Sequence, residues 1–139
     1  MTPDELPKVF AHGWALPKPE AFLDYFLPRI APDAIFTQPM FPRAIGHQQI
    51  AHTFWQLFAL VPNLTAVPVR TAIDHNTVFI ESTCTGTLAR RRVQFMVCDR
   101  FEVREGRIVE RHSYSDPLPL LLAVLRQPST WPLVLKART

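Results

Sequence analysis

Three side chains that can transfer protons stand at alternate positions near one end of a predicted strand. Residues 97–116 contain two strand-like segments around a Glu105-Gly106 turn, a pattern typical of a hairpin. Side chains two apart share a face of a strand, so we expect the second arm to align Ile108, Glu110, His112, Tyr114 and Asp116. A face that carries His, Tyr and Asp suits a walled pocket better than open water or a closed core.

The hairpin belongs to a longer proline-free block. The chain has 14 prolines, yet none falls between Val69 and Asp116. Proline cannot donate to a strand ladder, so this block predicts a continuous antiparallel sheet. We place its strands at residues 64–73, 77–87, 92–103 and 107–115. The links at 74–76, 89–91 and 105–106 are short, which makes consecutive strands antiparallel neighbours.

The first half of the chain is helical and punctuated by proline. Apolar residues at helical spacing predict helices over residues 3–15 and 19–26, and a longer one over residues 47–60 that ends at Pro62. Between them, residues 34–38 predict a short strand. We expect the long helix to pack on the sheet, because Ile50, Phe54, Leu57 and Phe58 form an apolar stripe.

Composition narrows the class of protein. The chain has 139 residues, 47% of them hydrophobic, which favours one globular domain over residues 1–139. Its net charge of +3 is mild and does not demand a nucleic-acid partner. The N-terminus lacks the pattern of a signal peptide, so we expect a cytoplasmic protein with Cys84 and Cys98 reduced.

No cofactor or metal site is expected from the motifs. His47 and His52 are five apart, which is not the same-face spacing of a helical metal pair. The sequence has no phosphate-binding or dinucleotide-binding loop. We interpret the basic cluster at residues 90–92 as a solvated turn rather than a phosphate site.

The order of elements resembles the nuclear transport factor 2-like superfamily, and within it the SnoaL-like proteins. The resemblance spans about residues 3–118 and rests on five segments, which are residues 32–39, 46–50, 79–86, 101–108 and 114–116. It implies an α+β, cystatin-like fold: a curved antiparallel sheet wrapped around N-terminal helices to form a cone with an apolar cavity. Relatives include polyketide cyclases, ketosteroid isomerases, limonene epoxide hydrolases and non-catalytic binding proteins, so fold does not settle function.

In catalytic relatives an acidic residue at the end of the last strand acts as general acid or base, and Asp116 holds the matching position. Desolvation in an apolar cone would favour that role. The alternative is structural, because Asp116 precedes Pro117 and an apolar run, a pattern typical of a helix cap. The two interpretations are not exclusive and both stay open.

The remaining candidates surround Asp116. His112 would relay protons or orient Asp116, and the Tyr114 hydroxyl would donate to a carbonyl or enolate oxygen; otherwise they form a polar pair at the cone mouth. Asp99 either faces the same space or pairs with a surface arginine such as Arg111. The expected substrate-binding residues are Asp99, Phe54, Phe58, Tyr25 and Trp14.

Two family patterns are not met. Limonene epoxide hydrolases couple the terminal Asp to an Arg and an Asp on a middle strand, but here that strand reads Glu81 to Thr85, so the Arg–Asp pair is missing and epoxide hydrolysis is disfavoured. Ketosteroid isomerases place a Tyr on an early helix and an Asp on an early strand, and neither Tyr25 nor Gln38 is a convincing match.

The C-terminal residues 117–139 are unusually apolar, yet their apolar runs are too short to span a bilayer, and no membrane partner is expected. This tail should cover the cavity or an interface, or form a core helix at residues 118–126. The resemblance also implies a homodimer. Two functions remain: a cofactor-free acid–base enzyme of cyclase or isomerase type acting on a small apolar or polycyclic carbonyl compound, or a non-catalytic ligand-binding or assembly module.

Overall fold

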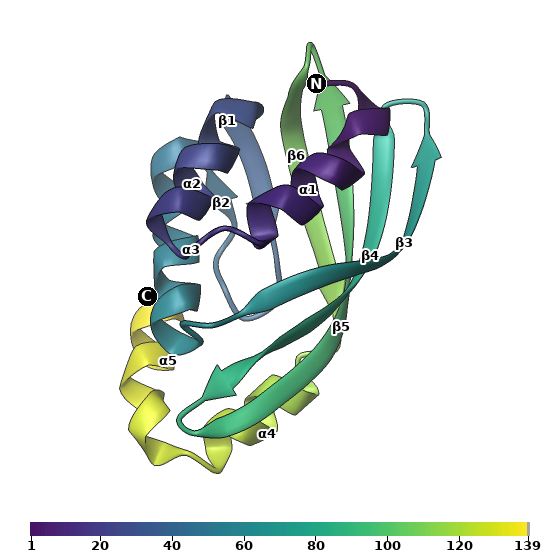
Figure 1. Cartoon of the computed structure of the whole chain (residues 1–139). Helices are drawn as coiled ribbons and strands as arrows, with labels where there is room; N and C mark the ends of the chain where they lie inside the picture. The colour runs from purple at the N-terminus through teal and green to yellow at the C-terminus, as the bar shows by residue number, and fades with distance from the viewer. Residues whose placement is uncertain (139) are drawn as a thin grey trace.

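One mixed sheet organises the chain. The computed structural model describes residues 1–138, and its six strands lie in the order β2-β1-β6-β5-β4-β3 (Figure 1). Their bounds are β1 Ile30–Thr37, β2 Ala44–Ile45, β3 Thr65–Asp74, β4 Thr77–Leu88, β5 Arg91–Arg104 and β6 Arg107–Ser115. The predicted α+β fold, with a curved sheet and N-terminal helices, is confirmed.

The four long strands form the predicted antiparallel meander, and the short links are tight turns. Residues 89 and 90 both have positive φ, as do Glu105 and Gly106. Two consecutive residues with positive φ are typical of the turns that match the twist of a hairpin. The early strand begins four residues before the predicted start and pairs in parallel with β6, so the sheet is not wholly antiparallel.

Three helices cover one face of this sheet (Figure 1). They are α1 (Leu6–Trp14), α2 (Glu20–Phe26) and α3 (Gly46–Leu60), close to the predicted ranges. Gly46 has φ of +83°, and the Gln49 side chain accepts a 2.9 Å hydrogen bond from the Ile45 N–H group, which together start α3 directly after β2. The His47 ring lies 2.7 Å from the Ile30 carbonyl oxygen and fixes α3 against β1.

The space between helices and sheet is filled largely by aromatic rings. Phe22 contacts four of them, with ring centroids 4.7–5.2 Å away, at Trp14, Phe26, Phe54 and Phe58. Such tilted and edge-on pairs favour a fixed packing arrangement. The inner residues of β4 and β5 complete this core.

The C-terminal tail folds into α4 (Leu118–Leu125) and α5 (Trp131–Arg138), with a short helical turn at Pro128–Thr130 between them. The helix expected at residues 118–126 is therefore present. Helix α4 contacts β5 and α5 contacts α3 (Figure 1). Within residues 1–138 no single helix has the length and apolar composition to cross a membrane, although α4 and α5, bent by 104°, meet that test as a pair.

Candidate functional site

A β-bulge in β6 decides which side chains reach the interior. Glu102 of β5 is opposite Glu110, but the next residue, Val103, is opposite Ile108, so Val109 is an extra residue on β6. A bulge of this kind changes the phase of alternation. Ile108 therefore points inward while Glu110 points outward, although they are two apart.

The expected common face of Ile108, Glu110, His112, Tyr114 and Asp116 is consequently wrong. Beyond the bulge the inward residues of β6 are Arg111, Ser113 and Ser115. His112 and Tyr114 lie on the outer face, where their rings stack at 4.3 Å and Tyr114 is 51% exposed. Neither ring lines the pocket inside the cone.

A buried ion pair occupies that interior. Arg111 Nε donates a 3.0 Å hydrogen bond to Asp99 Oδ1, and Arg111 Nη2 lies 3.0 Å from the same oxygen. Asp99 is 2% exposed and Arg111 8%. The partner expected for Asp99 is therefore correct, but the expected surface position of Arg111 is wrong.

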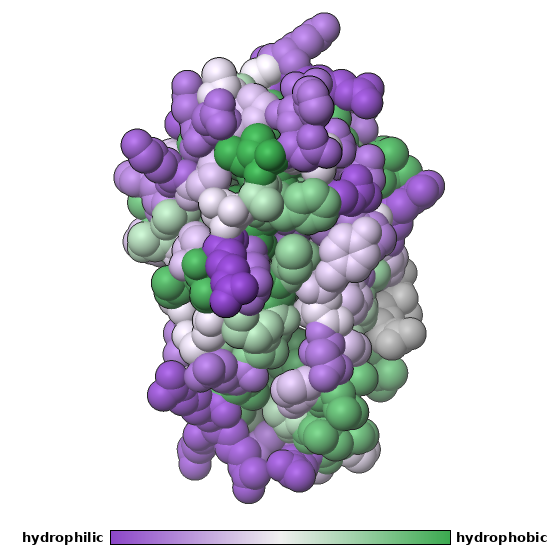
Figure 2. All heavy atoms as spheres, turned by 90° about the vertical axis from the view of Figure 1, so that its right-hand side faces the viewer, coloured by the Kyte–Doolittle hydropathy of each residue, from purple (hydrophilic) through white to green (hydrophobic). Residues whose placement is uncertain are grey.

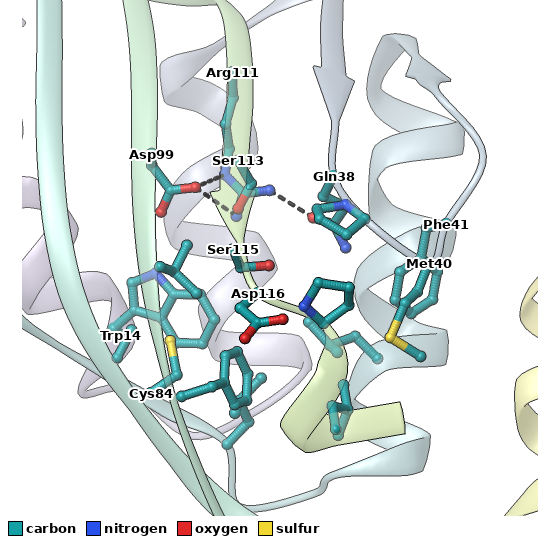
Figure 3. A pocket seen from close by; sticks show the side chains of 18 residues that line it. Trp14, Gln38, Met40, Phe41, Cys84, Asp99, Arg111, Ser113, Ser115 and Asp116 are labelled. Atoms are coloured by element: carbon teal, nitrogen blue, oxygen red, sulfur yellow. Dashed lines mark hydrogen bonds and ion pairs between the residues drawn. The ribbon is translucent and has the colours of Figure 1, made fainter. Parts of the chain in front are cut away.

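Gln38 holds the guanidinium from its other side. Its Oε1 accepts a 2.6 Å hydrogen bond from Arg111 Nη1 (Figure 3). The Arg111 side chain also lies over the rings of Phe36 and Phe54, at 5.5 and 5.6 Å from their centroids. Arg111 is thus fixed by three elements, and it in turn fixes Asp99 through one oxygen.

The Arg–Asp pair missing from β4 is therefore present in the molecule, supplied by two neighbouring strands. Phe101 is opposite Arg111 in the β5–β6 ladder, and Asp99 is opposite Ser113. Adjacent positions on one face of two paired strands bring the carboxylate and the guanidinium together. This pair differs from the family pattern in its placement, because its two residues stand on β5 and β6 while β4 itself carries neither an Arg nor an Asp.

A pocket of about 70 Å³ opens beside this pair. Its polar lining consists of Gln38, Asp99, Arg111, Ser113, Ser115 and Asp116, and its apolar lining includes Trp14, Met40, Phe41, Phe95 and Leu120. Figure 3 shows the second carboxylate oxygen of Asp99 turned away from Arg111 and toward this space. That volume fits a few water molecules or a small functional group.

Asp116 lies at the edge of the pocket and bonds the start of α4, as its structural interpretation predicted, although the N-cap residue of that helix is Pro117, one position later. Its Oδ1 accepts a 3.0 Å hydrogen bond from the Leu118 N–H group at the start of α4. The residue is exposed. Asp116 therefore holds the first turn of α4 and also lines the pocket.

The other expected binding residues divide into three groups. Trp14 lines the pocket, and it also lines a second, apolar pocket of about 30 Å³ that includes Phe54 and Arg111. Phe58 is buried in the aromatic core. Tyr25 lines neither pocket and instead packs against His12 and Arg29, with centroid distances of 4.8 and 3.9 Å.

Burial controls the chemistry of the cysteine in the pocket wall. Desolvation, with a further contribution from the negative charge of Asp99, raises the pKa of Cys84 to about 12. The thiol is therefore neutral and a poor nucleophile near neutral pH. Among residues 1–138 no group of three or more His, Cys, Asp or Glu side chains is arranged to bind a metal.

Ser113 and Ser115 were not among the residues predicted from the sequence, and Gln38 and Arg111 were named there without a place in the site. A usable signal was present on β5, where Asp99 alternates with Val97, Phe101 and Val103. A lone carboxylate in the apolar phase of a strand indicates a buried acid that needs a cationic partner on the same face. The bulge that brings Arg111 onto that face has no comparable sequence signal.

Solved structures of other proteins share this architecture. The chain superposes with a TM-score of 0.76 on a protein from Jannaschia sp. CCS1 assigned as a SnoaL-like polyketide cyclase, at 17% identity over 87% of this chain and 89% of the other. A protein from Catenulispora acidiphila with a ketosteroid isomerase-like fold gives 0.74 at 17% identity, over 88% and 93%. An epoxide hydrolase from M. tuberculosis of the limonene epoxide hydrolase-like type gives 0.67 at 23% identity, over 91% of each chain.

These identities show a common fold alone. No curated protein matches the chain in sequence. The family model for the SnoaL-like domain matches residues 9–111, a segment that runs from within α1 to Arg111 of the ion pair. Because that match covers well over half of its length, the chain belongs to the SnoaL-like family.

Proposed function

We propose that the chain is a cofactor-free acid–base enzyme acting on a small apolar carbonyl compound, with Asp99 as the proton-transferring residue. The observation that carries this proposal is the geometry of Asp99, whose Oδ1 is held by Arg111 while the other oxygen is turned toward the pocket. A carboxylate anchored by one oxygen presents the second in a fixed direction, as a general base requires.

The burial of the ion pair supports a functional role. Placing two charges in a low-dielectric interior costs more desolvation energy than a hydrophobic pair of similar volume. Stability alone therefore does not account for Asp99 and Arg111 at this position. Perturbed or buried charges in a pocket are typical of functional sites.

The reaction balances within the pocket. Asp99 accepts a proton from the carbon next to the carbonyl, and the electrons of that C–H bond move into the enolate. The hydroxyl groups of Ser113 and Ser115 lie on the same inner face and would donate to the enolate oxygen. Returning the proton to another carbon completes an isomerisation. In a cyclisation the enolate carbon attacks a second carbonyl, whose C=O π electrons move to its oxygen, and Asp99 returns the proton to that oxygen.

The apolar part of the substrate has a place beside this centre. The second pocket is lined almost entirely by apolar side chains of α1, α2, α3 and the sheet, and it shares Trp14 and Arg111 with the first. Both volumes are small, so a polycyclic substrate requires the Trp14 side chain to move and join the two pockets.

Epoxide hydrolysis is a second candidate, favoured specifically by the Asp99–Arg111 pair with Asp116 lining the same pocket. One carboxylate would take a proton from water as the water oxygen attacks an epoxide carbon. The other, protonated, would donate to the epoxide oxygen as the ring C–O bond breaks, which gives a diol. This reaction needs both Asp99 and Asp116, whereas the carbonyl reaction needs only Asp99.

A homodimer and a cytoplasmic location remain predictions. The dimer is supported by apolar side chains exposed on the outer face of the sheet, among them Val67, Phe79, Met96 and Tyr114. In a non-catalytic binding module, the alternative function, the same fold would hold a ligand without turnover.

The test is a turnover screen of polyketide-like, ketosteroid and epoxide compounds with the wild type and three variants. Asp99→Asn should lower carbonyl turnover by about a hundredfold to ten-thousandfold, because the amide cannot accept the proton. Asp116→Asn should keep it, since Asn caps a helix about as well as Asp. Glu102→Gln, on the outer face of the same strand as Asp99, is the matched control.

The variants distinguish the candidates. Loss of epoxide turnover in both Asp99→Asn and Asp116→Asn would identify the hydrolase. Circular dichroism and assays below each unfolding midpoint separate lost chemistry from lost folding. Full activity in folded Asp99→Asn would overturn Asp99 as the proton-transferring residue. No turnover by the wild type in any compound class would overturn the enzyme proposal and favour the binding module.

A further inference from the structure

The net positive charge of the chain comes from two segments that are distant in sequence. Residues 82–98 and 117–139 together carry six Lys and Arg residues and no Asp or Glu. The rest of the chain carries nine basic and twelve acidic residues, so it is net negative. The mild overall charge of +3 therefore hides a strong asymmetry.

The fold brings these segments to one end of the molecule. The β4–β5 hairpin tip lies beside α4 (Figure 1), and contacts between α4 and β5 hold them together. Arg90, Arg91 and Arg92 at the tip are all exposed, as is Arg126 directly after α4. The cluster interpreted from sequence as a solvated turn is thus part of a larger basic surface.

Apolar side chains are exposed at the same end. Leu118, Leu122 and Leu125 are 53%, 39% and 63% exposed and, spaced four and three apart, form one stripe along α4. Leu120 and Val124 lie on the opposite, buried side of α4. On α5 the exposed large hydrophobic residues within 131–137 are Trp131, Leu133 and Leu135. Figure 2 shows hydrophobic and strongly hydrophilic surface side by side at the lower end of the molecule.

We propose that this basic–apolar end, formed by Arg90–Arg92, Arg126 and the exposed apolar residues of α4 and α5, docks on the surface of an anionic lipid membrane. Helices that lie in a membrane interface combine Leu and Trp on one face with Lys or Arg beside them. Anionic lipid attracts clustered basic side chains and so adds to the apolar contribution. The Trp131 N–H group is already bonded to the Val124 carbonyl at 2.8 Å, so its ring can enter the interface without an unpaired donor.

Charge favours a lipid surface over a second copy of the chain. Two basic–apolar ends placed face to face would bring like charges together without an acidic residue in either segment to pair them. An anionic bilayer supplies the missing negative charge. The helices would lie on the membrane rather than cross it. This inference is independent of the proposed function, because it concerns a different surface.

Vesicle flotation with the full chain tests the proposal. We expect the wild type to float with vesicles of phosphatidylcholine and phosphatidylglycerol in equal parts, to float poorly with phosphatidylcholine alone, and to be released by salt. Arg91→Glu with Arg92→Glu, and separately Leu122→Ser with Leu125→Ser, should each weaken binding by at least about tenfold. Arg104→Glu with Arg107→Glu, at the opposite end of the sheet, makes the same charge change and should leave binding intact.

Four results would overturn the proposal. They are no binding of the wild type to anionic vesicles, equal binding to neutral vesicles, equal loss in the Arg104/Arg107 control, and unchanged binding in both test variants. Circular dichroism checks that each variant is folded, and light scattering measures its oligomeric state. If the Leu122/Leu125 substitutions convert a dimer to monomers and leave vesicle binding unchanged, the apolar stripe is a subunit interface.

Discussion

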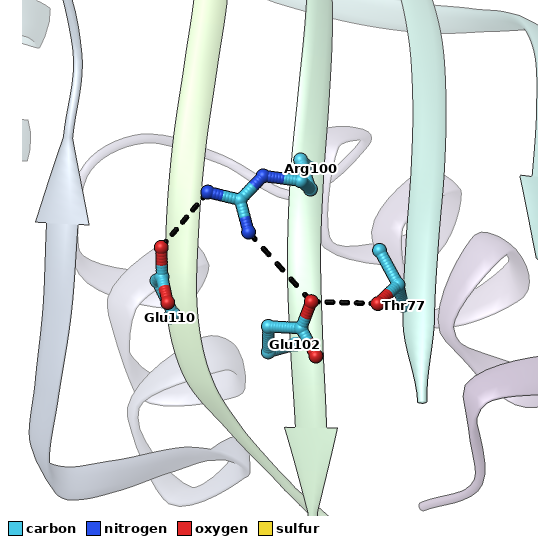
Figure 4. Close-up of polar contacts among 4 residues, drawn as sticks. All are labelled: Thr77, Arg100, Glu102 and Glu110. Atoms are coloured by element: carbon cyan, nitrogen blue, oxygen red, sulfur yellow. Dashed lines mark hydrogen bonds and ion pairs between the residues drawn. The ribbon is translucent and has the colours of Figure 1, made fainter. Parts of the chain in front are cut away.

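Two charge clusters stand back to back on the same pair of strands. Asp99 and Arg111 point inward, while their sequence neighbours Arg100 and Glu110 point outward. On the outer face Arg100 Nη2 lies 2.9 Å from Glu110 Oε1, and Arg100 Nη1 lies 3.6 Å from Glu102, whose Oε1 accepts a 2.6 Å hydrogen bond from Thr77 (Figure 4). The distances inside and outside are similar.

Burial is what separates the two clusters. The inner side chains are 9% and 3% exposed, and the outer three between 20% and 43%. Water screens the outer ion pairs, so each contributes little to folding. The inner pair has lost its water, so each charge depends on the other. We infer that the outer cluster provides a polar surface on the sheet, and that the inner cluster holds the reactive carboxylate of Asp99 in a fixed position.

The two clusters should differ most in the free energy of unfolding that is lost when one arginine is removed from each. Arg111→Met leaves the Asp99 carboxylate buried without its partner and should lower the free energy of unfolding by about 3–5 kcal/mol. Arg100→Met should lower it by less than about 1 kcal/mol. Urea denaturation measures both. Similar losses in the two variants would show that burial does not distinguish the clusters.

Replacing both inner charges should restore most of the stability that is lost when Arg111 alone is replaced. Asp99→Leu together with Arg111→Met leaves no buried charge, so its stability should return to within about 1 kcal/mol of the wild type, or exceed it. The double variant should remain inactive, because the proton acceptor is gone. A double variant as unstable as Arg111→Met would mean that packing, rather than charge, requires this pair.

Most of the fold follows from local sequence signals. The proline-free block between Val69 and Asp116 contains most of the antiparallel meander. Positive φ at Glu105 and Gly106 matches a turn that the sequence predicts, and the stripe along α3 has the period of its buried face. The parallel pairing of β1 with β6 is harder to predict from the sequence, because it joins residues about 75 positions apart. Nothing in residues 34–38 specifies which distant edge they will meet.

The site was harder to predict than the fold, because one extra residue on β6 changes which of its side chains face the interior. Simple alternation from Ile108 assigns His112 and Tyr114 to the interior, but the extra Val109 exchanges the two faces of β6. A one-residue slip moves every following side chain to the opposite face. Asp116 was identified correctly as a helix-capping residue, since that interaction spans only two residues.

The two cysteines repeat the comparison of inner and outer faces on a smaller scale. Cys84 is buried in the pocket wall, and Cys98 is half-buried on the outer face of β5. Desolvation raises the pKa of both thiols, that of Cys84 to about 12 from an ordinary value of 9.0. We expect iodoacetamide near pH 8 to modify Cys98 first in the native protein, and Cys84 only after unfolding, as read by mass spectrometry.

The same shift predicts a pH dependence. From pH 9 to about 12 the Cys84 thiol ionises in the unfolded chain but stays neutral in the native one, so ionisation stabilises the unfolded state and the free energy of unfolding falls as pH rises. Below pH 9 both states hold the proton and this contribution is constant. Cys84→Ala should flatten that decline, whereas Cys98→Ala should flatten it less. Equal slopes in the two variants, or native labelling of Cys84 as fast as that of Cys98, would contradict the separation of the faces by burial.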